Sequence, residues 1–224
     1  MSMPNQPHPI SPQSTQRHDD IVLSIDMVQL SDLHTGDKDS LKSNRAHAFA
    51  LDSAQRPIIR GSSLRGVLMQ QLEQCLDRTE FQQYFANNPA KPLFRQHPYQ
   101  FSFARIHAQP DSPLPMLRFR QHNAIDRATG AAKDNHLFSV QTTPVGTVWR
   151  FELRFVPRVI SDQQHIPVYA YLLNQVLGFW QNSDLCLGGR MREGYGRLRI
   201  INIDDHDTLT AVYRDRTDQT YFRT

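Results

Sequence analysis

Cysteine and long apolar runs are both scarce in this sequence. Only two cysteines, Cys75 and Cys186, occur among 224 residues. Neither has a neighbour at metal-ligand spacing, so we expect two free, buried thiols in a reducing compartment. No stretch reaches the roughly 18 apolar residues of a membrane span, and the N-terminus lacks the charged and then apolar order of a signal peptide. These absences argue against a disulfide-rich secreted domain and predict a cytoplasmic protein with no membrane partner.

Metal and nucleotide motifs are also missing. The 10 histidines include no His-Glu-x-x-His pattern and no clustered ligands, so we expect no structural metal and no cofactor. No Gly-Lys-Ser/Thr is present, which excludes a nucleotide-binding P-loop. Charge is nearly balanced, with 25 Lys and Arg against 22 Asp and Glu. The isoelectric point of about 9.0 is therefore only a weak indication of an anionic partner.

The apolar pattern predicts strands and helices in alternation. Ser62 or Ser63 is placed to cap the first helix. The order is strand, helix, strand or hairpin, helix and strand. We therefore predict an α+β protein with the βαββαβ core of ferredoxin-like folds, which RNA-recognition motifs also use. The expected elements are strands over residues 21–30, 148–156 and 197–203, and helices over 61–77 and 167–182.

Composition divides the chain further. Residues 1–18 are rich in Pro, Gln and Ser and are predicted to form a disordered arm. Residues 19–224 are expected to form a single domain. Two segments, at about 31–60 and 78–135, are predicted to be long insertions into its core. Within the second insertion, the Pro- and aromatic-interrupted stretch 84–117 predicts irregular structure.

A first candidate site is the stretch "PIIRGSSLRG", residues 57–66. A Gly-Ser-Ser turn enters a helix there, with Arg60 and Arg65 beside it. The free N–H groups and positive dipole end of a helix start favour an anion. A helix cap with no ligand explains the same residues equally well.

A second candidate is "LGGRMREGYGRLRI", residues 187–200, which holds four glycines and four arginines. Glycines let a backbone approach a phosphate closely, arginines pair with phosphate oxygens, and the ring of Tyr195 can stack on a base. A flexible, solvated turn is the alternative.

A third candidate is the basic stretch from Met116 to Phe138. "DRATG" within it has good turn chemistry, so the stretch is expected to project from the sheet as a hairpin. A basic arm of this kind is suited to clamping a nucleic-acid backbone, although a solvated hairpin tip is an equal alternative. Its positive side chains include Arg118, Arg120, His122, Arg127 and Lys133.

Taken together, these three segments resemble the CRISPR RAMP superfamily in order and spacing. The likeness is greatest to the repeated backbone subunit of type III effector complexes, and it covers roughly residues 20–200. It implies an RNA-binding subunit with a ferredoxin-like core. Copies of it polymerise along the spacer of a CRISPR RNA, beside other effector subunits, and a thumb-like projection intercalates where the guide pairs with its complementary target.

The resemblance and the charge pattern give one set of expected RNA-binding residues. The helix-start motif, the hairpin and the glycine-rich loop each contribute to it. The set is Arg60, Ser62, Ser63, Arg65, Arg118, Arg120, Arg127, Lys133, Gly188, Gly189, Arg190 and Arg192.

The first predicted insertion, at about residues 31–60, is a loop that departs from the family pattern. Target-cutting members carry a catalytic aspartate there with a metal ion, but the corresponding position here falls on Ala46, beside His47. Alanine cannot bind a metal or move a proton, so we expect RNA binding without target cleavage. Asp37, Asp39 and His47 stay as weak catalytic candidates, and Mg²⁺ enters only if the target-cutting alternative holds.

Two other functions stay open. One is a CRISPR-RNA-processing endoribonuclease of the same superfamily, for which the chain is short because that type normally has a second ferredoxin-like domain. The other is an unrelated RNA-binding protein that stacks bases on its sheet. Trp149, Phe151 and Phe155 alternate with charged residues and are expected to face the core instead.

Overall fold

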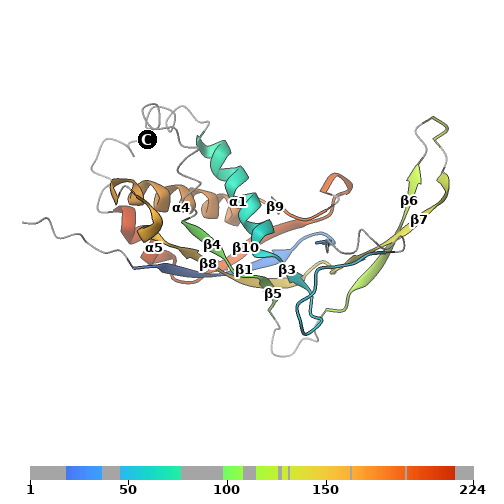
Figure 1. Ribbon diagram of the computed structural model, residues 1–224, viewed down its shortest axis with the longest axis horizontal. Helices are drawn as coiled ribbons and strands as arrows, with labels where there is room; N and C mark the ends of the chain where they lie inside the picture. The colour runs from blue at the N-terminus through green and yellow to red at the C-terminus, as the bar shows by residue number, and fades with distance from the viewer. Residues whose placement is uncertain are drawn as a thin grey trace, which may run out of the picture.

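The computed structural model describes most of the chain and shows a layered body from which a long hairpin projects (Figure 1). Helices α1 and α4 lie over one face of the main sheet, and the hairpin of β6 and β7 extends from one end of the body. No helix of the described part is long and apolar enough to cross a membrane. The described residues are 19–36, 46–76, 98–107, 115–125, 128–130, 132–161, 163–189 and 191–214.

The main sheet is antiparallel throughout and combines with the helices in a mixed α and β fold. Its order is β3-β5-β8-β1-β10-β9, and β4 also pairs with β8. The three predicted strands are confirmed as β1, β8 and β10. The strands are β1 (Ile21–Gln29), β3 (Ile58–Ile59), β4 (Tyr99–Phe101), β5 (Ala104–Ile106), β8 (Val148–Phe155), β9 (Leu185–Cys186) and β10 (Arg197–Ile203).

The prediction of irregular structure over residues 84–117 was wrong in part. Strands β4 and β5 lie within it and pair with β8, with Tyr99 opposite Phe155 and Arg105 opposite Arg150. Each strand has only three residues. Such a run is too short for alternation to be recognised in the sequence.

Alternation along β1 and β8 determines which face of the sheet is buried. Leu23 lies opposite Leu153, and Ile25 lies opposite Phe151. All four side chains are buried because successive strand residues point to opposite faces. Trp149 and Phe155 share the buried face, which confirms that the aromatic residues of β8 face the core.

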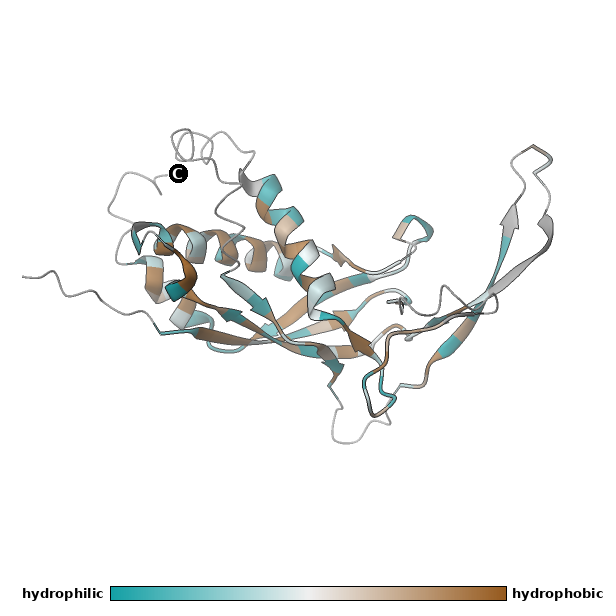
Figure 2. Ribbon diagram, in the orientation of Figure 1, coloured by the Kyte–Doolittle hydropathy of each residue, from teal (hydrophilic) through white to brown (hydrophobic). Residues whose placement is uncertain are grey.

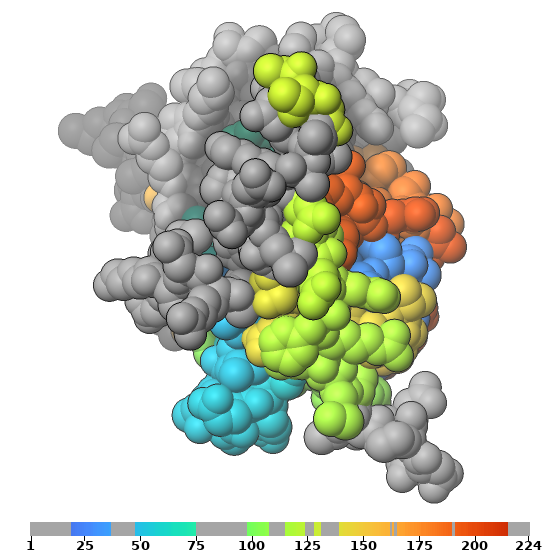
Figure 3. Space-filling model, turned by 90° about the vertical axis from the view of Figure 1, so that its right-hand side faces the viewer, coloured from blue at the N-terminus to red at the C-terminus, as the bar shows by residue number. Residues whose placement is uncertain are grey.

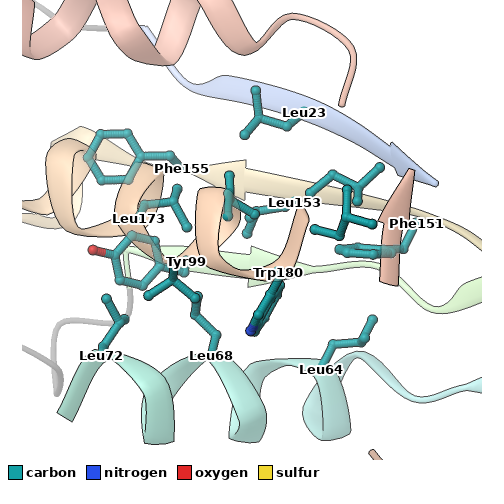
Figure 4. Close-up of a cluster of buried hydrophobic side chains, with 14 of the residues drawn as sticks. Leu23, Leu64, Leu68, Leu72, Tyr99, Phe151, Leu153, Phe155, Leu173 and Trp180 are labelled. Atoms are coloured by element: carbon teal, nitrogen blue, oxygen red, sulfur yellow. The ribbon is translucent and has the colours of Figure 1, made fainter. Parts of the chain in front are cut away.

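Two helices cover this face. Helix α1 (Gly61–Leu76) buries Leu64, Leu68 and Leu72, a stripe at the four-residue spacing of one helical face. Helix α4 (Ile166–Asn182) is apolar on most sides and buries ten residues, among them Trp180. Figure 4 shows the α1 leucines, Trp180 and the aromatic rings of β8 meeting in one core, and Figure 2 shows the apolar colour concentrated in this layer.

Both helices begin close to the predicted positions, but the predicted cap of α1 is corrected. Ser62 and Ser63 lie inside its first turn, and the carbonyl of Arg60 accepts the N–H groups of Ser63 at 2.9 Å and Leu64 at 3.3 Å. Arg60 therefore occupies the capping position.

A C-terminal helix was not predicted. After β10, a turn over Asp204 and Asp205 leads into α5 (His206–Arg214). Helix α5 buries Leu209 and Tyr213 and packs on α4. Short 3₁₀ turns complete the elements, at η3 (Pro157–Val159), η4 (Gln163–His165) and η5 (Met191–Glu193).

The predicted hairpin is present and belongs to a second sheet of order β2-β7-β6. Strands β6 (Arg118–Ile125) and β7 (Ala132–Thr142) pair antiparallel, and β2 (Ala46–His47) joins β7 in parallel. Gly130 lies in the turn with a φ of 68°, a conformation that suits glycine.

A buried polar cluster joins the hairpin to the sheet. The Gln29 amide is fully buried at the end of β1. Its Nε2 donates to the Thr143 carbonyl at 2.6 Å, and its Oε1 accepts from the Thr143 hydroxyl at 2.8 Å and from Trp149 Nε1 at 3.1 Å. One side chain thus satisfies three groups where β7 leaves the hairpin and β8 enters the sheet.

We predict that Gln29→Leu lowers the free energy of unfolding by about 2–4 kcal/mol, because it leaves buried groups of Thr143 and Trp149 without partners. Urea denaturation measures this change. Gln100→Leu is the matched control, because Gln100 is exposed on β4 and its replacement should cost little. Equal losses in the two variants would contradict the role given to Gln29.

Candidate nucleic-acid interface

Three segments meet where the hairpin leaves the body, and we call their meeting place the junction. They are residues 31–36 after β1, the glycine loop over residues 187–196, and the root of β6 over residues 118–122. Figure 3 views this end of the molecule and shows the three segments side by side on its surface.

The glycine loop is held against the segment after β1 by backbone hydrogen bonds. The Gly189 N–H donates to the His34 carbonyl, and the Gly196 N–H donates to the Asp32 carbonyl, both at 2.9 Å. The Arg197 N–H donates to the Ser31 hydroxyl at 2.9 Å. These bonds give the loop a fixed support although it has little regular structure.

Gly188 and Gly196 make this close packing possible. Their φ angles are 93° and 78°, and both values lie in the region that other residues rarely adopt. A Cβ on Gly188 would collide with the His34 carbonyl oxygen, and one on Gly196 would collide with the Leu187 carbonyl oxygen. The backbone that these two glycines approach is thus the protein's own, whereas the sequence had suggested approach to a phosphate.

The root of β6 turns one face toward the other two segments. Arg120 Nε donates to Asp32 Oδ2 at 2.7 Å, and this bond raises the pKa of Arg120. Two positions along, His122 Nε2 lies 3.0 Å from the Tyr195 hydroxyl, and His122 Nδ1 lies 3.4 Å from a carboxylate oxygen of Glu193. Alternation along the strand places Arg120 and His122 on the same face.

Strand β7 contributes to the junction from the other side of the hairpin. His34, which is buried, has Nδ1 at 2.9 Å from the Gln141 carbonyl oxygen, and the Gln141 side chain accepts the Phe49 N–H at 2.9 Å. The segment after β1 therefore contacts both the glycine loop and the hairpin.

The structure places some of the expected RNA-binding residues at the junction and others at the start of α1. Helix α1 begins over the sheet, and its first turn points toward the half of the body that carries the hairpin (Figure 1). Ser62 is exposed there, and Arg60, Ser63 and Arg65 are partly exposed. Arg118 and Arg192 are exposed at the junction, Gly189 is exposed and Gly188 is partly exposed.

Several expected residues cannot be placed. Arg127, Arg190, Asp37 and Asp39 lie outside the described residues. The backbones of Ala46 and His47 lie in β2, and that of Lys133 lies in β7. Ala46 lies opposite Ser139 and His47 opposite Val140, so both positions are on the hairpin sheet. Within the described residues, no group of three or more His, Cys, Asp or Glu side chains could hold a metal ion.

Sequence reasoning missed the acceptors that organise the junction. Asp32, His34 and Glu193 follow no motif, and only the contacts made after folding single them out. The expectation of two buried thiols was also wrong for Cys186, which is exposed on β9.

The sheet face away from the helices carries charged side chains, unlike the apolar face that the helices cover. Along β1 and β8 its outward side chains include Asp26, Arg150, Glu152 and Arg154, and no aromatic ring. Asp26 accepts two hydrogen bonds from Arg150, at 2.7 and 2.6 Å, and the hydrogen bonding with Arg150 lowers the pKa of Asp26. These positions offer no ring on which a base could stack.

Comparison with known proteins identifies relatives of the chain. The model of the family described as "RAMP superfamily" matches residues 29–199, well over half of the sequence. None of the curated proteins compared with the sequence matches it.

Solved structures share the fold at low sequence identity. A chain of a type III-B Cmr-beta complex bound to cognate target RNA matches with a TM-score of 0.54 and 14% identity, over 83% of this chain and 60% of that one. A chain of a type IV-B CRISPR complex gives 0.54 and 18%, over 83% and 91%. A chain of the type III-B Cmr-beta complex in its apo state gives 0.53 and 13%, over 82% and 97%.

We predict that Gly188→Ala destabilises the protein more than Gly194→Ala. Both glycines have positive φ angles, 93° and 86°, so both substitutions should cost about 1–2 kcal/mol of backbone strain. Only Gly188 would also drive a Cβ into the His34 carbonyl, whereas the space around Gly194 is open. The collision should add about 1–3 kcal/mol. Urea denaturation of the two variants compares them, and equal losses would show that the close contact is unimportant.

Proposed function

Because the chain belongs to the RAMP superfamily, we propose that it is an RNA-binding backbone subunit of a CRISPR RNA-guided effector complex. The observation that supports this function is the junction. Three polar segments, far apart in the sequence, meet at one end of the fold and expose Arg118 and Arg192 beside a fixed glycine loop. Arginines on a rigid backbone suit phosphate recognition that does not depend on sequence.

We propose further that the body is the ferredoxin-like core. In the main sheet, β10 lies beside β1, β1 lies beside β8, and β8 pairs with both β4 and β5. Helix α1 connects β1 to β4, and α4 connects β8 to β10. This is the arrangement expected of a βαββαβ core, with the hairpin of β6 and β7 as an insertion before β8. Residues 19–224 would then form a single domain.

The proposed mechanism assigns a role to each part of the junction. The arginines of the glycine loop and of the start of α1 would hold the phosphates of the guide strand, and the positive dipole end of α1 would add to this attraction. The hairpin would reach across the guide where it pairs with the complementary target. Copies of the chain would repeat this grip along the spacer, beside other subunits of the complex in the cytoplasm.

We also propose that this subunit does not cut the target. Its first loop has Ala46 at the position that corresponds to the family's catalytic aspartate, and alanine offers neither a metal ligand nor a proton-transfer group. The guide-holding role would therefore be separated from any cleavage made by another subunit.

Arg192→Ala should weaken guide binding to a similar extent for unrelated spacer sequences. It should also reduce the slope of log affinity against log salt by about 0.7 if one phosphate contact is lost. The complex is purified after co-expression with its partner subunits, and its affinity for labelled guide RNA is measured at several salt concentrations. Arg158→Ala is the matched control, because Arg158 is exposed on η3. A loss confined to one spacer sequence would contradict the backbone role.

Incubation of the assembled complex with complementary labelled RNA and Mg²⁺ tests the alternative, a metal-dependent target endoribonuclease. We expect tight binding and an intact target. Cuts at regular intervals would support the enzyme, and substitution of Asp37, Asp39 and His47 would then locate the activity.

A further inference from the structure

We propose that Tyr195, His122 and Glu193 form a latch that fixes the direction of the β6-β7 hairpin relative to the glycine loop. This inference rests on the proposed function, because it takes both parts to be contacts to RNA. It assigns positioning roles to three residues that need not touch the RNA themselves.

The contacts of His122 carry the proposal. Its ring lies between the Tyr195 hydroxyl, 3.0 Å from Nε2, and the Glu193 carboxylate, 3.4 Å from Nδ1. The rings of His122 and Tyr195 also pack at a tilt, with centroids 5.7 Å apart. The His122 side chain is only 19% exposed, so this position of β6 is held against the glycine loop.

The chemistry of the imidazole suits a permanent latch. A neutral ring with its proton on Nδ1 donates to Glu193 and accepts from the Tyr195 hydroxyl. A protonated ring donates to both oxygens and adds an ion pair with Glu193. One imidazole ring can therefore satisfy both partners at once, and the contact is suited to holding a fixed geometry.

The position of the latch on β6 allows it to restrict movement of the hairpin. Backbone hydrogen bonds anchor the glycine loop to the segment after β1, so this loop is the fixed partner. The hairpin is anchored at its base by the Arg120–Asp32 ion pair and by the bond between His34 and Gln141. His122 lies further along β6 than Arg120, so its contacts limit the swing of the hairpin beyond that base. Fixing this direction would set the spacing between guide phosphates at the glycine loop and the duplex at the hairpin.

A distance measurement by pulsed electron paramagnetic resonance tests the latch without RNA. Spin labels are placed on Thr129→Cys in the hairpin turn and on the exposed Cys186 of the body, in the full chain with Cys75→Ser. The double variant His122→Phe/Tyr195→Phe keeps both rings and removes the polar contacts. Its ratio of latched to open hairpins should fall about tenfold, which broadens the distance distribution. Tyr195→Phe alone should give a smaller broadening in the same direction.

Tyr213→Phe is the matched control, because Tyr213 is a tyrosine of α5 that packs against Tyr171 and should leave the distribution unchanged. An unchanged distribution in the double variant would overturn the latch. A second measurement compares affinities of the assembled complex. The double variant should lose several-fold more affinity for the guide–target duplex than for the guide alone, and equal losses would overturn the positioning role. A wild-type complex that binds no RNA would overturn the proposed function, while the distance measurement would still decide whether the latch exists.

Discussion

The antiparallel pairing of β1 with both β8 and β10 is the constraint on which the other features depend. It buries one face of the sheet under α1 and α4, and it brings the ends of three distant segments to the same edge. The chain leaves β1 toward the hairpin end, where the glycine loop enters β10 and the hairpin enters β8. The junction is therefore a consequence of strand pairing. Its side chains stabilise a contact between three segments that the core already brings together.

Polar interactions then stabilise one arrangement of the segments at the junction. The buried amide of Gln29 joins the end of β1 to the base of the hairpin, and the glycine loop packs so closely on His34 that a Cβ at Gly188 has no room. Buried hydrogen-bonding groups are costly to leave without partners, so each of these contacts favours one arrangement of loop and hairpin. A surface assembled from loops can in this way be rigid enough to bind a flexible strand.

The parts of the fold that follow strong periodic patterns could be predicted from the sequence. Strand β8, with alternating Trp149, Phe151, Leu153 and Phe155, and helix α1, with leucines four residues apart, were both anticipated. Strands β4 and β5 were missed because three residues carry no period, and α5 was missed because a short helix that buries only Leu209 and Tyr213 gives no clear apolar stripe. The glycine loop was found from its composition, but its partners Asp32 and His34 were not, since their role arises from contacts across more than a hundred residues.

Crosslinking of a guide RNA that carries 4-thiouridine, followed by identification of the modified peptides, would show where the RNA lies on this subunit. We expect crosslinks in the glycine loop, at the start of α1 and along β6, at the same positions for unrelated spacer sequences. Crosslinks concentrated on the outward face of β1 and β8, around Arg150 and Arg154, would contradict this expectation. That result would place RNA on the open sheet and leave the junction as a purely structural feature.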